Sequence, residues 1–421
     1  MLGITVSRRL FGCITMFLFF PLLPARAGAQ TEKVLYSFSG TTGAKPFGLT
    51  EDASGNFYGA SAATTTQSYG SIYRLAKGSS GHWNMTVLYV FKGLWDGKYP
   101  NAKLVVDSAG NVYGTTAQGG SFHDCSCGTV FELSPRSSGS WKETTLYSFQ
   151  GGNDGAEPHA GLTSDSAGNL YGTAYVGGTA DLGTVFKLSP VSGGGWSEST
   201  LYSFQGGSDG LEPSAPVVLD QSGNIYGVTE IGGGQGSCYG TYGCGTVFEL
   251  TPNSGSWSES ILHTFTGSGD GGVPTGGLAV DQYGDIYGVA NRGGYVSLCG
   301  GIGCGAAFIL EPYFGSWVFY TIHGFQDLID GAYPVGGLTT GKAADVVYGT
   351  TTSDGPSCCG TVFKLSATQA GWTGSVLYSF TGEPDGAYPY GNLILDAHGN
   401  LYGTTTAGGA DNQGTIFKLF P

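Results

Sequence analysis

The chain has 421 residues, of which 77 are glycine, 25 tyrosine and 23 phenylalanine, and only 11% are charged. Glycine disfavours helices and aromatic residues favour strands, so this composition predicts an all-β protein. The net charge is −14, and it becomes −17 without the first 29 residues, which hold three arginines and no acid. Because nucleic acids and anionic membranes are bound by clustered Lys and Arg, we do not expect either as a partner of so acidic a protein.

Residues 1–29 have the pattern of a secretory signal peptide. Arg8 and Arg9 precede an apolar run from Leu10 to Leu23, and small residues follow up to Ala29. We expect the mature protein to begin near Gln30 and to be exported, to the periplasm or outside the cell. No later apolar stretch approaches the ~20 residues that a membrane-spanning helix needs. We therefore expect no membrane span. We also expect the protein to be a monomer.

The rest of the chain, residues 30–421, is a tandem repeat with a period in the fifties. Each unit carries D-G-x-x-P, an apolar segment ending in Asp, a turn with N-x-Y-G, a Gly-rich loop, G-T-V-F, and a Trp-containing segment that ends in L-Y-S-F. The L-Y-S-F position recurs at Leu35, Leu88, Leu146, Leu201, Leu262, Ile322 and Leu377. Four short β segments separated by turn residues predict one four-stranded antiparallel blade, and a period of this size indicates a propeller or an array.

The order of the segments predicts a closed ring. N-x-Y-G and G-T-V-F segments each occur seven times, but the last one, residues 414–417, has no L-Y-S-F segment after it. The copy at residues 31–38 has no unit before it. A closed ring would use this copy as the fourth strand of the last blade, whereas an open array would need caps at both ends. We therefore predict a single-domain, seven-bladed β-propeller.

Two features inside each unit support this prediction. Six tryptophans stand five residues before the L-Y-S-F position, as Trp141 stands before Leu146, so Trp and Leu should face opposite sides of one strand and pack against different neighbours. The turn from Asp107 to Asn111 places Asp where it can cap the turn and Gly110 where φ is positive. The sixth unit lacks this pattern at residues 341–345, so its hairpin should differ.

The units "DSAGNLYGTAYVGGTADLGTVFKLSP" and "LYSFQGGSDG" closely resemble the Gloeo-Verruco, or GloVer, tandem repeat of exported bacterial proteins. The resemblance extends over residues 31–421. It implies a secreted or surface propeller, and it brings no catalytic residues because the family has no established activity. Members often end in a sorting signal, whereas this sequence ends at Phe420-Pro421, which favours a free periplasmic or secreted protein.

Eight cysteines remain once Cys13 leaves with the signal peptide, and they form four local pairs in the loop between the second and third strands. The pairs are Cys125/Cys127, Cys238/Cys244, Cys299/Cys304 and Cys358/Cys359. An even number of paired cysteines in an exported chain predicts disulfides. The adjacent Cys358 and Cys359 are the least secure pair and could instead be a labile redox element. A zinc site is the alternative, but no C-x-x-C or neighbouring His accompanies the pairs.

A candidate ligand rim comes from the D-G-x-x-P loops, which should emerge on the same face as the cysteine loops. Its residues are Asp96, Asp154, Asp209, Asp270, Asp330 and Asp385, with Tyr99, Tyr333 and Tyr388. The acids could bind a cation or sugar hydroxyls, and the tyrosines could stack on a ligand. The competing interpretation is that Asp-Gly forms the same turn six times. Irregular loop residues on this face, His123-Asp124, Glu230, Asn291-Arg292 and Asp354, are further candidates.

The sequence contains no conventional catalytic motif, so we predict no catalytic residues and no metal or cofactor; nothing in the pattern supports calcium. The first hypothesis is a non-enzymatic binding scaffold whose rim contacts a glycan, a peptide or another cell-envelope component. The alternative is an extracellular carbohydrate-active enzyme, a lyase or hydrolase, with its site at the axial opening. A scaffold predicts repeated, equivalent rim residues. An enzyme predicts one asymmetric pocket with a carboxylate pair, or with His, Arg and Tyr.

Overall fold

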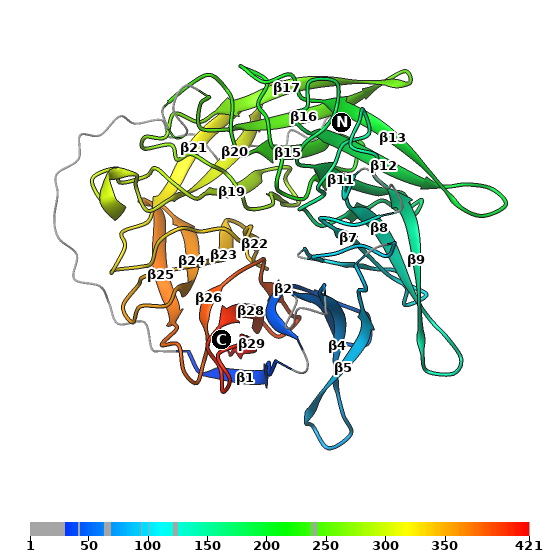
Figure 1. Cartoon of the computed structure of the whole chain (residues 1–421). Coiled ribbons are helices and arrows are strands. Elements are labelled where there is room, and N and C mark those ends of the chain that lie inside the picture. Colours follow the sequence, from blue (N-terminus) through cyan, green and yellow to red (C-terminus); the bar gives the residue numbers. More distant parts are fainter. Residues whose placement is uncertain are drawn as a thin grey trace, which may run out of the picture.

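The computed structural model describes residues 30–420 except 41–42, 63–68, 94, 101, 121–124, 237 and 239–241, and in these residues it forms a ring of seven antiparallel sheets (Figure 1). The signal-peptide prediction concerns residues 1–29, which lie outside this part. The described residues contain one helical segment, the short 3-10 turn η1 (Cys299–Gly301). None of their helices is long and apolar enough to cross a membrane.

Each sheet is one blade, and in six of the seven the strands lie in chain order from the axis outward. The first three blades are β2 (Ala44–Glu51), β3 (Phe57–Ala62), β4 (Ser71–Lys77) and β5 (Trp83–Val90); β6 (Val105–Val106), β7 (Val112–Thr116), β8 (Thr129–Pro135) and β9 (Trp141–Ser148); and β10 (Thr163–Ser164), β11 (Leu170–Ala174), β12 (Thr184–Pro190) and β13 (Trp196–Ser203).

The next three blades repeat the pattern. They are β14 (Val218–Leu219), β15 (Ile225–Thr229), β16 (Thr246–Asn253) and β17 (Ser256–Thr264); β18 (Ala279–Val280), β19 (Ile286–Ala290), β20 (Ala306–Tyr313) and β21 (Ser316–Gly324); and β22 (Thr339–Thr340), β23 (Val346–Thr351), β24 (Thr361–Thr368) and β25 (Gly371–Ser379). The sixth hairpin differs as predicted, with the Gly341 amide donating to the Val346 carbonyl and Asp345 at φ 58°.

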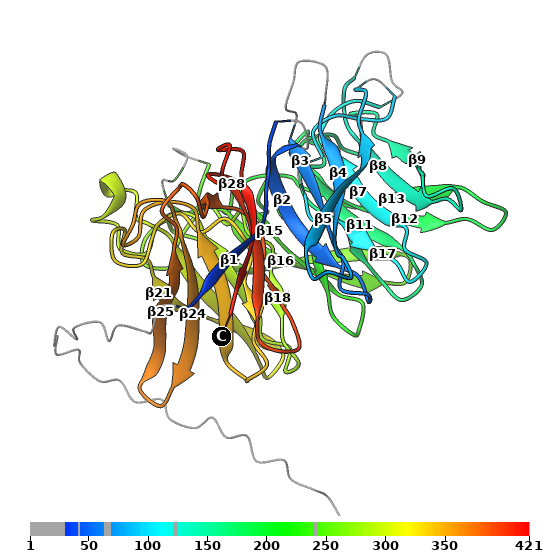
Figure 2. The same cartoon turned by 90° about the horizontal axis from the view of Figure 1, so that it is seen from below.

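The seventh blade closes the ring with the first strand of the chain. Its inner strands β26 (Ala387–Pro389) and β27 (Ile394–Leu395) pair with β28 (Leu401–Ala407), which pairs with β29 (Thr415–Leu419). The N-terminal strand β1 (Glu32–Ser37) pairs with β29, from Glu32 opposite Leu419 to Ser37 opposite Thr415. Both views place β1 beside the C-terminal strands (Figures 1 and 2). The predicted closure is confirmed.

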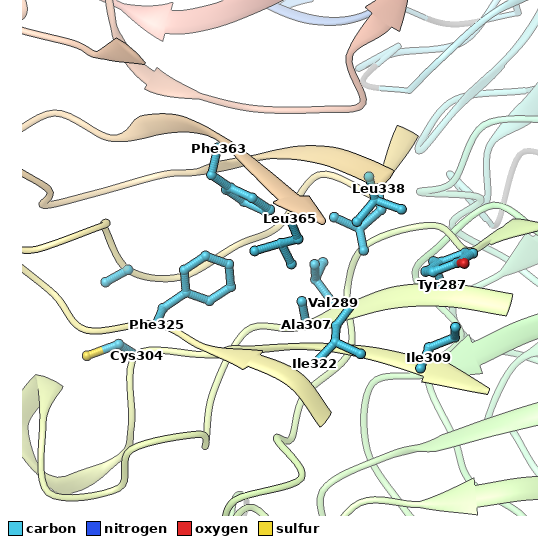
Figure 3. Close-up of a cluster of buried hydrophobic side chains, with 12 residues drawn as sticks. Tyr287, Val289, Cys304, Ala307, Ile309, Ile322, Phe325, Leu338, Phe363 and Leu365 are labelled. Atoms are coloured by element: carbon cyan, nitrogen blue, oxygen red, sulfur yellow. The ribbon is translucent and has the colours of Figure 1, made fainter. Parts of the chain in front are cut away.

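The core consists of seven apolar clusters, one at each contact between blades, because both faces of every blade pack against a neighbour. In the G-T-V-F strand β8, Val130 packs toward blade 3 and Phe131 toward blade 1. Gly114 of N-x-Y-G lies under that Phe: a Cβ there would be 2.7 Å from its Cζ. Figure 3 shows the equivalent cluster between blades 5 and 6, where Phe325 and Phe363 meet at a ring-centroid distance of 4.9 Å.

The L-Y-S-F strands contain a β-bulge that the sequence analysis did not foresee. In blade 2, Tyr147 pairs with Val130 and Thr145 with Phe131, so Leu146 is the extra residue, and the same irregularity recurs in every blade. Trp141 packs in the cluster toward blade 1 and Leu146 in the cluster toward blade 3. The prediction that Trp and Leu face different neighbours is therefore confirmed.

Candidate functional site

The six repeated Asp side chains each bind their own loop. Asp154 accepts hydrogen bonds from the Tyr147 hydroxyl at 2.8 Å and from the Gln150 amide at 2.8 Å. The equivalent acceptors for a Tyr hydroxyl or a His ring are Asp96, Asp209, Asp270, Asp330 and Asp385. Asp96 and Asp385 are buried. These contacts favour the turn-forming interpretation over a ligand role for the carboxylates.

In four of these places a Glu from the next blade approaches the same Asp. The pairs are Asp96 with Glu143, Asp154 with Glu198, Asp209 with Glu259, and Asp385 with Glu32. Burial, with the nearby Asp charge second, raises the pKa of Glu32 and of Glu259 from 4.5 to about 7. Burial and Asp154 likewise raise the pKa of Glu198 to about 7, against the effect of its hydrogen bond from Thr200.

At the two remaining loop carboxylates, Asp270 and Asp330, both neighbouring residues differ from those in the other units. His263 and His323 take the place of Tyr beside Asp270 and Asp330, and the residue opposite is Phe319 or Gly374 in place of Glu. Phe319 stacks on the His263 ring at a centroid distance of 3.6 Å. Burial opposes ionisation of Asp270, but its hydrogen bonds from His263 and Thr266 outweigh burial and lower its pKa. The residues around each loop Asp therefore change together from one blade contact to the next. We infer that these side chains stabilise the contacts between blades.

The residue before each loop proline has a left-handed backbone in all seven units. These residues and their φ values are Lys45 (49°), Tyr99 (60°), Glu157 (55°), Glu212 (59°), Val273 (59°), Tyr333 (58°) and Tyr388 (55°). Each amide donates to the carbonyl of the residue before the Gly of a G-T-V-F segment, as Glu157 does to Cys127 at 2.8 Å. Non-glycine residues avoid this conformation at a cost of about 1–3 kcal/mol, and such strain clusters at functional sites.

The predicted rim tyrosines occupy this strained position, and two of them are open to solvent. Tyr99 is 42% exposed and Tyr388 49% exposed, while Tyr333 is half-buried. The loops that carry them pair with the second-to-third-strand loops through isolated bridges, as Ala156 does with Val176. The two sets of loops therefore share one face of the ring, as predicted. Whether a ligand contacts Tyr99, Tyr333 or Tyr388 stays a prediction.

On this face the axis of the ring opens into a cavity of about 480 Å³. Its wall is formed mainly by the residues that follow the loop prolines. The residue directly after the proline lines the cavity in six units: Phe47, His159, Ser214, Thr275, Val335 and Tyr390. The next residue is Gly or Ala in every unit, which leaves the opening wide. One position of a regular repeat therefore presents six different side chains to one space, which we call the axial cavity.

The side of the axial cavity formed by blades 3 and 4 carries two hydrogen-bonded pairs. His159 Nε2 lies 3.2 Å from Glu157 Oε2. The Tyr175 hydroxyl donates to Glu212 Oε2 at 2.6 Å, and the Tyr175 ring meets the His159 ring edge-on at 5.1 Å. A carboxylate that orients an imidazole and another that orients a phenol can position both groups for hydrogen bonding or proton transfer.

Across the axial cavity, blade 7 contributes an aromatic wall. Tyr390 meets Phe47 edge-on at 5.8 Å. Burial raises the pKa of Tyr390, and the negative charge of Glu230, which also lines the cavity, raises it further. The phenol therefore stays neutral and can donate a hydrogen bond at physiological pH. Flat aromatic faces beside polar groups are suited to ligands with one apolar and one hydroxylated side.

The four cysteine pairs form disulfides in the structure, in the second-to-third-strand loops. Their Cα–Cα distances are 5.2 Å (Cys125–Cys127), 5.1 Å (Cys238–Cys244), 5.3 Å (Cys299–Cys304) and 3.7 Å (Cys358–Cys359). The carbonyls of Cys127, Cys244, Cys304 and Cys359 accept the amides of the strained loop residues described above. No group of His, Cys, Asp and Glu in the described ranges is arranged to hold a metal ion.

Sequence reasoning selected Glu230 for this face but not the cluster around it. The other irregular candidates lie apart from the axial cavity: Arg292 donates to the Cys238 carbonyl and Asp354 accepts from Ser353, while His123 and Asp124 lie outside the described residues. His159, Tyr175, Glu157, Glu212 and Lys103 were missed. The signal was present, since the residue after the loop proline changes in every unit while the proline and the small residue that flank it repeat.

The fold and the loops define this protein as a β-propeller repeat protein with an asymmetric axial cavity. The Gloeobacter/Verrucomicrobia repeat matches residues 18–241 and 237–421. The chain therefore belongs to the Gloeobacter/Verrucomicrobia repeat family, as the resemblance implied.

Solved structures share the fold at low sequence identity. A catalytically inactive virginiamycin B lyase from Staphylococcus aureus, crystallised with quinupristin, is 15% identical with a TM-score of 0.54, covering 93% of this chain and 100% of that one. The polysaccharide lyase Uly1 is 11% identical with a TM-score of 0.53, covering 94% of this chain and 93% of that one. A search of curated proteins found no significant match. At these identities the likeness shows the fold alone.

Proposed function

We propose that this protein is an exported binding protein that holds a sugar-sized polar ligand, a glycan residue, in the axial cavity. One observation carries the proposal: the residue after the loop proline, which faces the cavity, differs from unit to unit, while the proline before it and the Gly or Ala after it repeat. The four disulfides suit a chain that works in an oxidising compartment outside the cytoplasm.

The shape and chemistry of the axial cavity support a glycan ligand. Its volume of about 480 Å³ lies within the usual range of small-molecule sites. Phe47 and Tyr390 offer aromatic surface to the apolar face of a sugar ring. His159, Ser214 and Thr275 offer hydrogen-bonding groups to its hydroxyls.

A glycan array probed with the mature protein tests this proposal. We expect Tyr390→Ala to weaken binding of any glycan found by at least tenfold, because it removes one aromatic wall. Tyr283→Ala is the matched control, since Tyr283 is 60% exposed in the turn between β18 and β19, at the opposite ends of the strands. Equal binding by both variants would contradict the proposal. Loss with Tyr99→Ala or Tyr388→Ala but not Tyr390→Ala would place the ligand on the rim.

The two hydrogen-bonded pairs favour a second candidate, a carbohydrate-active lyase that acts on the bound glycan. A lyase needs a group that removes a carbon-bound proton and one that protonates the leaving oxygen, and His159 and Tyr175 are placed beside each other with their own carboxylates. A lyase product carries a new C=C bond that absorbs ultraviolet light. Tyr175→Phe keeps the ring and should abolish product formation while retaining binding. Bound glycans that stay intact with the wild type would reject this candidate.

A further inference from the structure

We infer that the axial cavity selects ligands carrying a single negative charge, such as a sugar with one carboxylate or one sulfate ester. The inference rests on the proposed function, because it names the class of glycan that this cavity binds. It is carried by Lys103, together with two hydroxyl groups in the same wall.

Lys103 is the only cationic lysine or arginine among the described residues that line the axial cavity. It stands three residues after its loop proline, where the other units have Leu49, Gly161, Pro216, Gly277, Gly337 and Asn392. The lysine is therefore an exception within the repeat, placed on blade 2 alone. A repeat position that is otherwise uncharged needs no lysine to build the blade.

The backbone of both neighbouring blades closes around Lys103. A Cβ on Gly161 would lie 2.5 Å from the Lys103 carbonyl oxygen, and one on Gly48 would lie 3.2 Å from its Cα. The lysine side chain still reaches solvent inside the cavity. Nearby protein atoms lower the pKa of its ammonium group by desolvation, although the residue is exposed. Cavity walls of low polarity strengthen the attraction between this ammonium group and a bound anion.

In the part of the chain that the structure describes, no carboxylate lies within ion-pair distance of the Lys103 ammonium. Glu157 and Glu212, on blades 3 and 4, are bonded to His159 and Tyr175. The Ser214 Oγ and Thr275 Oγ1 atoms are buried and have no hydrogen-bond partner among the described residues. Lysine and the two hydroxyls, from blades 2, 4 and 5, are donors of the kind that hold carboxylate or sulfate oxygens.

The acids around the axial cavity disfavour a ligand with more than one negative charge. Lys103 can contact one anionic group, while Glu230 lines the same cavity and Glu157 and Glu212 stand beside it. These acids repel a dianion more strongly than a monoanion, and cavity walls of low polarity strengthen the repulsion. Glucuronic acid and a sugar sulfate carry one negative charge and meet this condition. A sugar phosphate, which is largely dianionic at neutral pH, does not.

Isothermal titration calorimetry with the mature protein at pH 7 tests the inference, using glucuronate, glucose 6-sulfate, glucose 6-phosphate and glucose. We expect the two monoanions to bind at least tenfold more tightly than glucose or the phosphate. Lys103→Met should remove this preference by weakening the binding of the two monoanions. Lys103→Arg, which keeps the charge, should retain it, and this second variant keeps the test informative if Lys103→Met folds poorly. Lys142→Met, at the exposed position of strand β9, is the control and should retain the preference.

The possible failures are distinguishable. Glucose binding as tightly as glucuronate, or a preference that survives in well-folded Lys103→Met, would overturn the inference and leave the proposed binding function intact. Tighter binding of glucose 6-phosphate than of both monoanions would also overturn it. Absence of binding by all four sugars and by every glycan on the array would overturn the inference and the proposed function together.

Discussion

The Glu259 side chain between blades 3 and 4 predicts that this protein loses stability as the pH rises from about 4.5 to about 7. Burial and the charge of Asp209 raise the pKa of Glu259 from 4.5 to about 7, and its Oε1 atom is buried without a hydrogen-bond partner among the described residues. A carboxyl group whose pKa is higher in the fold binds its proton more tightly there. Its stabilisation is therefore complete below pH 4.5 and is lost as the pH rises through about 7.

The size of the effect follows from the shift. A shift from 4.5 to about 7 would correspond to about 3.4 kcal/mol for a fully buried group. Glu259 is half-buried, and solvent screening reduces this to about 1 kcal/mol. Glu32 and Glu198 have the same shifted pKa at two other blade contacts. Because such distant sites act independently, the wild type should lose about 3 kcal/mol between pH 5 and pH 9.

Urea unfolding at pH 5, 7 and 9 measures this loss. Glu259→Gln cannot ionise, so we expect its free energy of unfolding to fall by about 1 kcal/mol less than that of the wild type between pH 5 and pH 9. Glu383→Gln removes the same charge from an exposed loop residue and should follow the wild type. If Glu259→Gln and the wild type show parallel pH dependence, the interpretation of this blade contact is wrong.

Three further predictions test the ring and its loops. Deleting residues 30–39 removes β1 and uncovers the edge of β29, so we expect an aggregated product in size-exclusion chromatography; a stable, unperturbed monomer would refute closure. Asp209→Ala leaves the Tyr202 hydroxyl and the Gln205 amide without their acceptor, and should cost about 1–3 kcal/mol in urea unfolding, while an unchanged midpoint would show that the loop does not need the carboxylate. Replacing Cys238 and Cys244 by Ser opens a loop of about seven residues and should cost about 2 kcal/mol; a reductant should then affect the variant less than the wild type, and equal effects would argue that this bridge contributes nothing.

Much of the fold could be predicted because its causes are local and repeated. The Asp107 carboxylate accepts the Ala109 and Asn111 amides at 2.9 and 2.8 Å, and Gly110 has φ 83°, as the turn pattern indicated. The bond between Tyr147 and Asp154 joins residues seven apart in sequence and repeats with the unit. Such regularities recur in every copy, so a sequence pattern can expose them.

The candidate site was harder to predict because it is formed by residues that the repeat does not connect. The Tyr175 hydroxyl and Glu212 belong to neighbouring units, and Tyr390 meets Phe47 across the contact between the seventh and first blades. Their proximity depends on the curvature of the ring. The Asp residues, by contrast, were conspicuous because they repeat, and their bonds show that repetition here reflects the construction of the loops.

The sequence by itself determined the blade, the number of blades and the strand that closes the ring. Turn residues, alternating apolar positions and an unpaired terminal segment act over a few residues or follow from counting. Only the tertiary structure decided which side chains meet at the axis and which carboxyl groups share a blade contact. Those contacts depend on how seven twisted sheets pack around a common axis. At the axis, residues from different units lie close together although they are far apart in the sequence.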